Sequence, residues 1–238
     1  MLHVSQNELV ATIQRALKAR GVNVGQRNEA AEAAVLMERH GLGGADAIVG
    51  ALRHCSEDSL HTLEEHYRED GLRIFTAAGA SVVHVGSLII DILRSMMGEG
   101  DPVCLHVKEC RNGDLMSGYL LRMAGLCPNM VVRWLAENDT GYRFACLEER
   151  QRIRLCCVPC PTAEHGKKDA VVLYCSRSIL FSLENLAARV PEDDCREVVW
   201  ENFRFEDRLS YTGFDLSESC WSQLRETAKG VLVEDEMA

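Results

Sequence analysis

Apolar residues recur at helical spacing along the N-terminal part of the chain, from Leu9 to Leu52. Leu9, Ile13 and Leu17 fall on one face of a predicted helix, because positions three to four apart lie together on a helix surface. Ser5 and Glu8 precede this face as an S-x-x-E capping box, in which each side chain satisfies a backbone N–H at the helix start. The pattern predicts a small helical unit with helices over 5–20, 26–40 and 44–54.

The pattern changes after Gly79, where alternating and short apolar runs replace most of the helical spacing. SVVHVG (81–86) predicts a short strand or turn, and the charged stretch 57–70 predicts a helix or loop. The run GSLIIDILRSM is apolar on most sides and predicts a buried helix. Strands are predicted over 102–108, 129–136, 142–148, 152–158, 170–176 and 197–205, and helices over 86–96, 112–126 and 217–232.

This mixture of elements predicts an α/β or α+β fold, with an N-terminal helical unit packed on a mixed β-sheet body. We place the helical unit at 1–56 and the sheet body at 57–238, together forming one compact globule. The clearest predicted linker lies at 160–169. The 238 residues, 47% hydrophobic and 26% charged, are typical of a chain that buries a proper core.

The formal net charge of −10 disfavours two classes of partner. A nucleic-acid footprint needs clustered Lys and Arg, and an anionic membrane surface attracts basic segments. No apolar run reaches the roughly 18–20 residues of a membrane span. The N-terminus lacks the basic start and apolar core of a secretory signal. We therefore expect a cytoplasmic protein that binds neither nucleic acid nor membrane, and whose 11 cysteines are free thiols.

The stretch RLCCVPCPTAEHG contains the candidate metal ligands Cys157, Cys160 and His165. Thiolates at C-x-x-C spacing can share a zinc ion, but a tetrahedral site needs a fourth ligand and no second C-x-x-C occurs. A redox pair is the second alternative, although Pro161 and a polar loop follow where a thioredoxin-type motif opens a helix. We favour a buried strand that uses cysteine as a small apolar residue, and therefore assign no metal.

The stretch CRNGDL predicts a turn between a strand and a helix, and it supplies candidate cofactor-binding residues: Arg111, Asn112 and Gly113. Backbone N–H groups at a helix start attract anions, and Arg111 would add a positive charge. The alternative is an ordinary Asn-Gly turn followed by a capping Asp114. We favour the ordinary turn, so that the cofactor stays unassigned.

The order of these segments resembles the type-2 malate/L-lactate dehydrogenase family across about residues 5–176. The S-x-x-E-L helix start, an A-x-x-A second helix, PVCLHVK, GYLLRMAGL, NMVVRWLAEN and LCCVPCP are similar to that family's elements. The resemblance implies a non-Rossmann oxidoreductase fold, an NAD(P) cofactor and a homodimer. The ERHGLGG and WSQLRETAK segments also resemble a family of uncharacterised bacterial proteins of this size, to which no activity is assigned.

The functional motifs of the dehydrogenase family do not carry over to this chain. The family's Asp-Ser-His-Gly turn, which holds its catalytic histidine, corresponds here to GLGGADAIVG, with no histidine inside it. His40 and Asp46 lie beside that turn and are the candidate substitutes, but no catalytic residue is assigned. Hydride transfer to a carbonyl needs a proton donor, which the replaced motif no longer supplies.

Three functions stay open at this stage. The favoured one is an oxidoreductase-like but non-catalytic or divergent protein that acts as a ligand- or partner-binding subunit. The first alternative is an NAD(P)-dependent reductase of a small 2-oxo or cyclic imino acid, and NAD(P) is implied only in that case. The second alternative is a protein-interaction module. Under each we expect a homo-oligomer, most simply a dimer.

Overall fold

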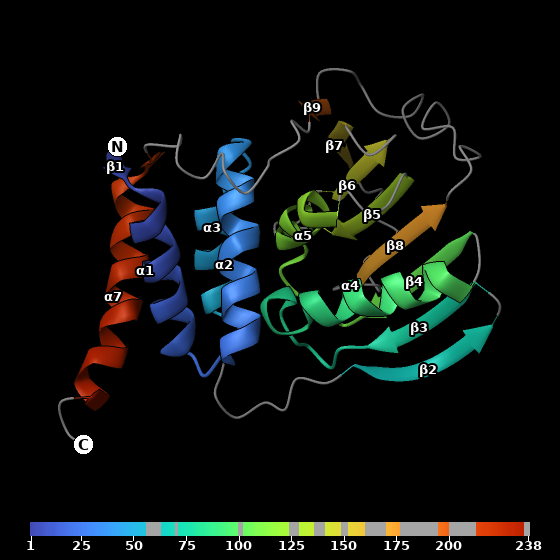
Figure 1. Cartoon of the computed structure of the whole chain (residues 1–238), viewed down its shortest axis with the longest axis horizontal. Coiled ribbons are helices and arrows are strands. Elements are labelled where there is room, and N and C mark those ends of the chain that lie inside the picture. The colour runs from blue at the N-terminus through green and yellow to red at the C-terminus, as the bar shows by residue number, and fades with distance from the viewer. Residues whose placement is uncertain are drawn as a thin grey trace.

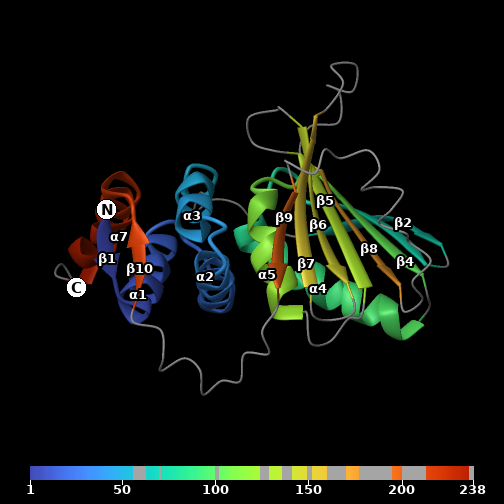
Figure 2. The same ribbon diagram turned by 90° about the horizontal axis from the view of Figure 1, so that it is seen from above.

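The computed structural model describes ten stretches of the chain and the elements they form. They are 1–55, 63–69, 71–99, 102–123, 129–135, 141–148, 152–159, 170–176, 195–199 and 213–235. The elements lie in successive layers, with helices α7 and α1 at one end, α3 and α2 next, then α4 and α5, and the sheet at the other end (Figures 1 and 2).

The outer helical layers contain segments from both ends of the chain. Helix α1 (Gln6–Lys18) packs against α7 (Glu218–Asp235), although the two helices come from opposite ends of the sequence. Two short strands, β1 (Leu2–Val4) and β10 (Phe214–Leu216), pair antiparallel and join the two segments directly. Helices α2 (Val24–Arg39) and α3 (Gly44–Leu52) complete this part of the fold.

The sheet has eight strands in the order β2-β3-β4-β8-β5-β6-β7-β9. Strands β3 and β4 are parallel, and every other neighbouring pair is antiparallel. The strands are β2 (Glu64–Glu69), β3 (Leu72–Thr76), β4 (Val103–Lys108), β5 (Asn129–Leu135), β6 (Gly141–Glu148), β7 (Arg152–Pro159), β8 (Ala170–Ser176) and β9 (Cys195–Val199).

Helices α4 (Val82–Glu99) and α5 (Met116–Met123) lie between the sheet and α2, and the short 3-10 helix η1 (Gly113–Leu115) leads into α5. Small residues let α2 approach its neighbours closely. A Cβ at Gly118 of α5 would lie 2.4 Å from the carbonyl oxygen of Ala33. A Cβ at Gly44 of α3 would lie 2.0 Å from that of Ala34. Helix α2 is therefore the central helix of the molecule, buried through alanines.

The structure confirms the predicted fold class and most of the predicted elements. Helices α1, α2, α3 and α7 and strands β4 to β8 occupy the predicted segments. The Ser5 hydroxyl accepts a hydrogen bond from the Glu8 N–H at 3.2 Å, as expected for the cap. The predicted strand 197–205 corresponds to β9 over 197–199, and the rest of it, like the predicted linker 160–169, lies outside the described residues.

Two predictions were wrong. Residues 82–86, expected as a strand or turn, form the first turns of α4, since their valines are buried in a helix rather than paired in the sheet. Residues 64–69, expected as helix or loop, form the edge strand β2, whose side chains are all exposed. None of the described helices is long and apolar enough to cross a membrane.

Candidate functional site

Two turns meet at the carboxyl ends of the parallel strands β3 and β4. We call residues 77–81 and 109–112, which follow these strands, the paired turns. Backbone hydrogen bonds join them: Gly79 N–H donates to the Glu109 carbonyl at 2.8 Å, and Arg111 N–H donates to that of Ala80 at 2.9 Å. In α/β sheets, ligands bind at this edge, outside the carboxyl ends of parallel strands.

The paired turns hold left-handed backbone at residues other than glycine. Ala78 has φ 48°, Glu109 has φ 53° and Asn112 has φ 59°. Within the described stretches these are the non-glycine residues with positive φ, and all three lie in the paired turns. A side chain in this conformation is strained by contact between its Cβ and the backbone, least so for asparagine. Such strain persists only where the surrounding structure holds it.

Asn112 connects the paired turns to the outer helices. Its side chain is buried, and its amide nitrogen lies 3.3 Å from Nδ1 of His54, which follows the end of α3. Next to it, Gly113 packs directly on Trp134 of β5, where a Cβ would come within 2.5 Å of the tryptophan Cβ. The sequence candidates Asn112 and Gly113 are thus part of the core, whereas Arg111 is exposed at the rim.

A carboxylate beside these residues joins two neighbouring strands. Asp114 accepts hydrogen bonds from Trp134 Nε1 at 2.6 Å and from Arg143 of β6 at 2.9 Å. The sequence predicted that Asp114 caps a helix. In the structure its carboxylate accepts hydrogen bonds from Trp134 and Arg143. Sequence spacing held no signal for this contact, because β5 and β6 come together with η1 only in the folded sheet.

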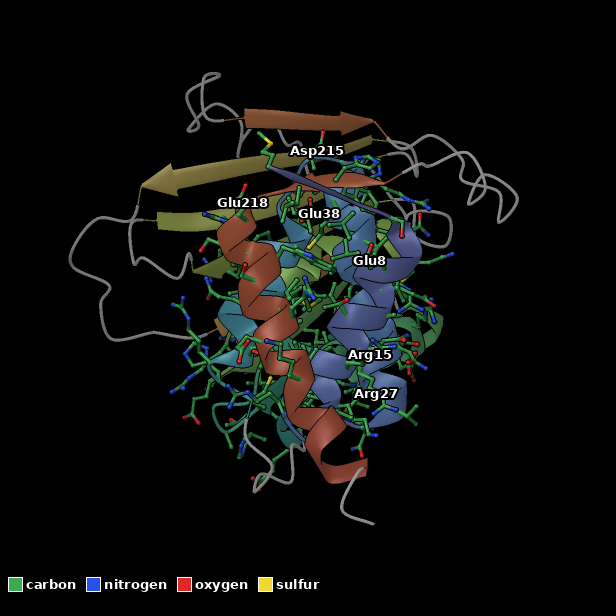
Figure 3. All side chains as sticks on the ribbon, turned by 90° about the vertical axis from the view of Figure 1, so that its left-hand side faces the viewer. Glu8, Arg15, Arg27, Glu38, Asp215 and Glu218 are labelled. Atoms are coloured by element: carbon green, nitrogen blue, oxygen red, sulfur yellow. The ribbon has the colours of Figure 1, made fainter. Side chains whose placement is uncertain are left out.

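The candidate residues His40 and Asp46 flank a second cluster, at the turn between α2 and α3. His40 caps the end of α2, and Asp46 lies in the first turn of α3. Near the end of α2, Glu38 (Figure 3) accepts a hydrogen bond from the Ala45 N–H at 2.6 Å. It takes the place of the capping side chain that the N-cap residue Gly43 lacks. Gly41 and Gly43 supply left-handed backbone, with φ 66° and 67°.

Burial and charge perturb two titratable groups in this second cluster. Burial raises the pKa of the Glu38 carboxyl above its ordinary value; the N–H of Ala45 opposes this rise, and the Asp46 charge adds to it. Burial also raises the pKa of the Cys220 thiol, on α7, to about 12, with further contributions from a hydrogen bond to Asp46 and the nearby carboxylates. Sequence reasoning missed Glu38 and Cys220, since no motif connects α7 with the α2–α3 turn.

Helix α3 separates the two groups of candidates. Asp46 lies at its start and His54 just beyond its end, so about 12 Å of helix axis lies between them at 1.5 Å per residue. The structure brings Arg111, Asn112 and Gly113 together in one turn, and His40 and Asp46 to another. It does not unite the two sets into one site.

The metal candidates fall largely outside what the structure describes. Cys157 belongs to β7, where its backbone lies opposite Arg143 of β6, and Cys160 and His165 lie outside the described residues. Among the described side chains, no three His, Cys, Asp or Glu residues are grouped as metal ligands. The strand predicted at 152–158 is present, and the zinc and redox alternatives for its cysteines stay untested.

A family described as "Protein of unknown function (DUF3726)" matches residues 4–80, about a third of the chain. No curated protein sequence shows significant similarity to the chain. Solved structures match over nearly the whole length. A sulfolactate dehydrogenase from Methanocaldococcus jannaschii is 9% identical with a TM-score of 0.58, and the match covers 98% of this chain and 99% of that one.

Two further structures agree with this result. A dehydrogenase from Sinorhizobium meliloti is 10% identical with a TM-score of 0.61, covering 95% of this chain and 99% of its own. A malate dehydrogenase from Entamoeba histolytica is 7% identical with a TM-score of 0.57, and the match covers 96% of this chain and 97% of that one. Identities this low establish the fold alone. The chain therefore has the fold of malate/lactate dehydrogenase-like proteins, with an N-terminal segment that matches a family of unknown function.

Proposed function

We propose that this protein binds a small ligand at the paired turns and keeps the dehydrogenase-like fold in a non-catalytic or divergent form. The observation that carries the proposal is the concentration of Ala78, Glu109 and Asn112, all with positive φ, in two hydrogen-bonded turns. Strained backbone of this kind costs about 1–3 kcal/mol per residue and clusters at binding and catalytic sites. The carboxyl ends of parallel strands are also where open α/β sheets bind ligands.

The second cluster supports a non-catalytic or divergent role. A general acid must come within hydrogen-bond reach of the proton that it transfers. Glu38 is used to cap α3, and Asp46 accepts from the Cys220 thiol. Both lie near the other end of α3 from the paired turns. The carboxylates nearest the replaced family motif are thus engaged in holding helices together.

The start of α4 does not fit the diphosphate of a nicotinamide dinucleotide. Such a group binds to open N–H groups at a helix start. Here the Val82 N–H donates to the Arg111 carbonyl at 2.9 Å, and the Val83 N–H donates to the Ser81 hydroxyl at 3.3 Å. The protein's own atoms already satisfy these donors. A smaller ligand held at the rim, beside the exposed Arg111, fits the paired turns better.

The second candidate function is an NAD(P)-dependent reductase of a small 2-oxo or cyclic imino acid. The observation that favours it is Glu38, because a carboxyl whose pKa is raised by burial keeps a proton to a higher pH and so can act as a general acid. This reading requires the dinucleotide to bind elsewhere than at the start of α4.

A thermal-shift titration separates the two candidates. Pyruvate and oxaloacetate serve as small anionic probes, and NADH and NADPH as dinucleotide probes. A ligand at 100 times its dissociation constant stabilises a protein by ~2.7 kcal/mol. For a chain of this length, that corresponds to a rise of about 5–10 °C in melting temperature. A saturable shift with a 2-oxo acid, without NADH oxidation, is the expected result.

Matched variants locate the binding. Arg111→Ser should lower the apparent affinity for the 2-oxo acid at least about tenfold, because it removes the positive charge at the rim. Arg94→Ser, on the exposed side of α4, should leave it unchanged. NADH oxidation that Glu38→Gln abolishes would instead establish the reductase. No shift with any of the four probes at millimolar concentration would refute both functions.

A further inference from the structure

Two cysteines occupy directly opposite positions at one edge of the sheet. Strands β7 and β9 are antiparallel, and in their register Cys156 is the partner of Cys195. Residues that face each other in an antiparallel pair have Cα atoms about 4.5–5.5 Å apart and share one face of the sheet. A disulfide needs a Cα separation of roughly 4.4–6.8 Å. The backbone therefore places these two residues at a distance that a disulfide can span.

The same register sets two neighbouring cysteines apart from this pair. Cys157 is the next residue of β7, and successive residues of a strand belong to opposite faces, so Cys157 and Cys195 do not share a face. Cys146 of β6 is opposite Arg154, which makes it a diagonal neighbour of Cys156 at about 7–8 Å. That separation exceeds the span of a disulfide. Among the cysteines of β6, β7 and β9, Cys195 is therefore the one that Cys156 can reach.

The cross-strand row that contains this pair belongs to the more exposed face of the sheet. Cys156 is opposite Phe144 of β6, and Phe144 is opposite Arg133 of β5. Val172 of β8 continues the row beyond Arg133. Arg133 is exposed and Val172 is half-buried, whereas the adjacent row, which passes through Ala145, is buried in the core. A small oxidant in solution can therefore approach this face of the sheet.

Strand β9 is an edge strand, and β7 is its neighbour in the sheet (Figure 2). Its five residues all pair with β7, from Val199 opposite Arg152 to Cys195 opposite Cys156. An edge strand is held by a single ladder of hydrogen bonds, so it opens more readily than a central strand. The two cysteines are 39 positions apart in the chain. A disulfide between them would close a long loop and fix one end of β9 to β7.

We propose that Cys156 and Cys195 form a reversible disulfide when the glutathione pool becomes oxidised, which makes this edge of the sheet a redox modification site. The thiolate of one cysteine attacks a sulfur of glutathione disulfide, releases one glutathione and leaves a mixed disulfide. The thiolate of the other cysteine attacks the cysteine sulfur of that mixed disulfide and releases the second glutathione. The two protein thiols lose two electrons, glutathione disulfide gains them, and the two protons pass to the glutathione thiolates. Excess glutathione reverses both steps.

Oxidation of the folded chain in glutathione buffers tests the proposal. The ratio of glutathione disulfide to glutathione is raised in steps, free thiols are blocked with N-ethylmaleimide, and the protein is digested with trypsin. Trypsin cleaves after lysine and arginine, so the disulfide should join peptide 155–167 to peptide 190–196. Fragmentation of the joined peptides by mass spectrometry should assign the bond to Cys156 rather than to Cys157 or Cys160. Excess glutathione should separate the peptides again.

Matched variants test whether the strand register selects the bond. Cys156→Ser and Cys195→Ser should each abolish the joined peptides, whereas Cys157→Ser should leave their yield unchanged, because Cys157 belongs to the other face. Unfolding in urea before oxidation should remove the preference for Cys156 over Cys157, since the register no longer exists. If a serine variant does not fold, the fragmentation of the wild-type peptides still decides which cysteine is bonded.

The disulfide should also stabilise the folded chain. The melting temperature of the wild type should be about 5–10 °C higher in the oxidised buffer than in the reduced one, and that of Cys195→Ser should not rise. Three results would overturn the proposal. They are a wild type without joined peptides at every glutathione ratio, a bond from Cys195 to Cys157 or Cys160, and joined peptides that persist in Cys156→Ser. A bond that forms without the rise in melting temperature would also contradict it, because a bond in the native register stabilises the fold.

Discussion

Two regions with left-handed backbone lie near the two ends of α3, and they differ in the residues that adopt it. At the start of α3, the α2–α3 turn needs left-handed backbone at two positions, and both are glycines, Gly41 and Gly43. Beyond its end, His54 contacts the paired turns, where one positive-φ position is a glycine, Gly79, and the other three are Ala78, Glu109 and Asn112. Glycine adopts this conformation without strain. The α2–α3 turn is therefore unstrained at these two positions, whereas the paired turns hold strained backbone at three residues.

This contrast favours the paired turns over the α2–α3 turn as the candidate binding site. The α2–α3 turn uses its polar groups in internal contacts, including the Glu38 cap and the Asp46–Cys220 pair. The paired turns have an exposed rim and a strained backbone, at the edge where open α/β sheets generally bind ligands. The following predictions test the comparison, from the largest effect to the smallest.

Gly44→Ala should lower the free energy of unfolding by about 3 kcal/mol or more. Its Cβ would lie 2.0 Å from the backbone carbonyl of Ala34, and a helix backbone cannot move aside as a side chain can. Urea denaturation measures the effect. Gly25→Ala, in the first turn of α2, is the control, because nothing lies within 4 Å of its Cβ. Equal stability of the two variants would show that α3 is not packed tightly at its start.

Glu38→Ala should lower the free energy of unfolding by about 1–2 kcal/mol, as the loss of a helix cap does. Glu38→Gln should cost less, because its amide oxygen can still accept from the Ala45 N–H. Urea denaturation of both variants separates the capping role of this side chain from its charge. Equal losses for the two variants would show that the glutamine amide does not replace the carboxylate as the cap.

The pH dependence of stability tests the charge of Glu38 independently. Its folded-state pKa is raised above the ordinary 4.5, so its contribution to stability is fully present below pH 4.5 and is lost as the pH rises through the folded-state value. Melting temperatures of the wild type should therefore fall relative to those of Glu38→Gln above pH 4.5. A parallel pH profile for the two proteins would contradict the buried, protonated state.

Ala78→Gly should raise the free energy of unfolding by about 0.5–1 kcal/mol, because glycine relieves the strain of a positive φ. Glu109→Gly should act in the same direction. The control is Ala11→Gly in α1, where glycine should instead lower stability by about 1 kcal/mol. If Ala78→Gly destabilised the protein as Ala11→Gly does, the two turns would not differ in strain.

His54→Ala should have the smallest effect, a loss of about 0.5–1 kcal/mol from one hydrogen bond. Its interest lies in ligand binding at the paired turns, which should weaken if the contact between His54 and Asn112 holds the turn in shape. The thermal-shift titration measures both the melting temperature of the variant and its affinity for the ligand. Unchanged affinity with reduced stability would confine His54 to a structural role.

The N-terminal helices could be predicted because their signals are local. The Ser5 cap and the stripe of Leu9, Ile13 and Leu17 lie within one short segment, and the structure places all three apolar side chains in the core. Strand β2 could not be predicted in this way. Its sequence EEHYRE lies exposed on both faces, so no alternation marks it, and it is a strand because it pairs with β3.

Of the candidate site residues, the turn at Arg111, Asn112 and Gly113 was predictable from the Asn-Gly pair. The strain at Ala78 and Glu109 was not, since nothing in these residue types indicates left-handed backbone. The partners of Asn112 and Asp114 come from α3, β5 and β6, distant in the chain. Long-range contacts depend on which elements share a layer, and local spacing does not encode that.

The sequence by itself determined the helical segments, the faces that they bury and the mixed α/β class, because periodicity and caps act within a few residues. Only the tertiary structure decided that β1 pairs with β10, that α7 lies on α1, and that α3 joins the strained turns to the capped one. Some of these contacts unite the two ends of the chain. Their energy comes from burial and hydrogen bonding between elements, which exist only once the layers have assembled.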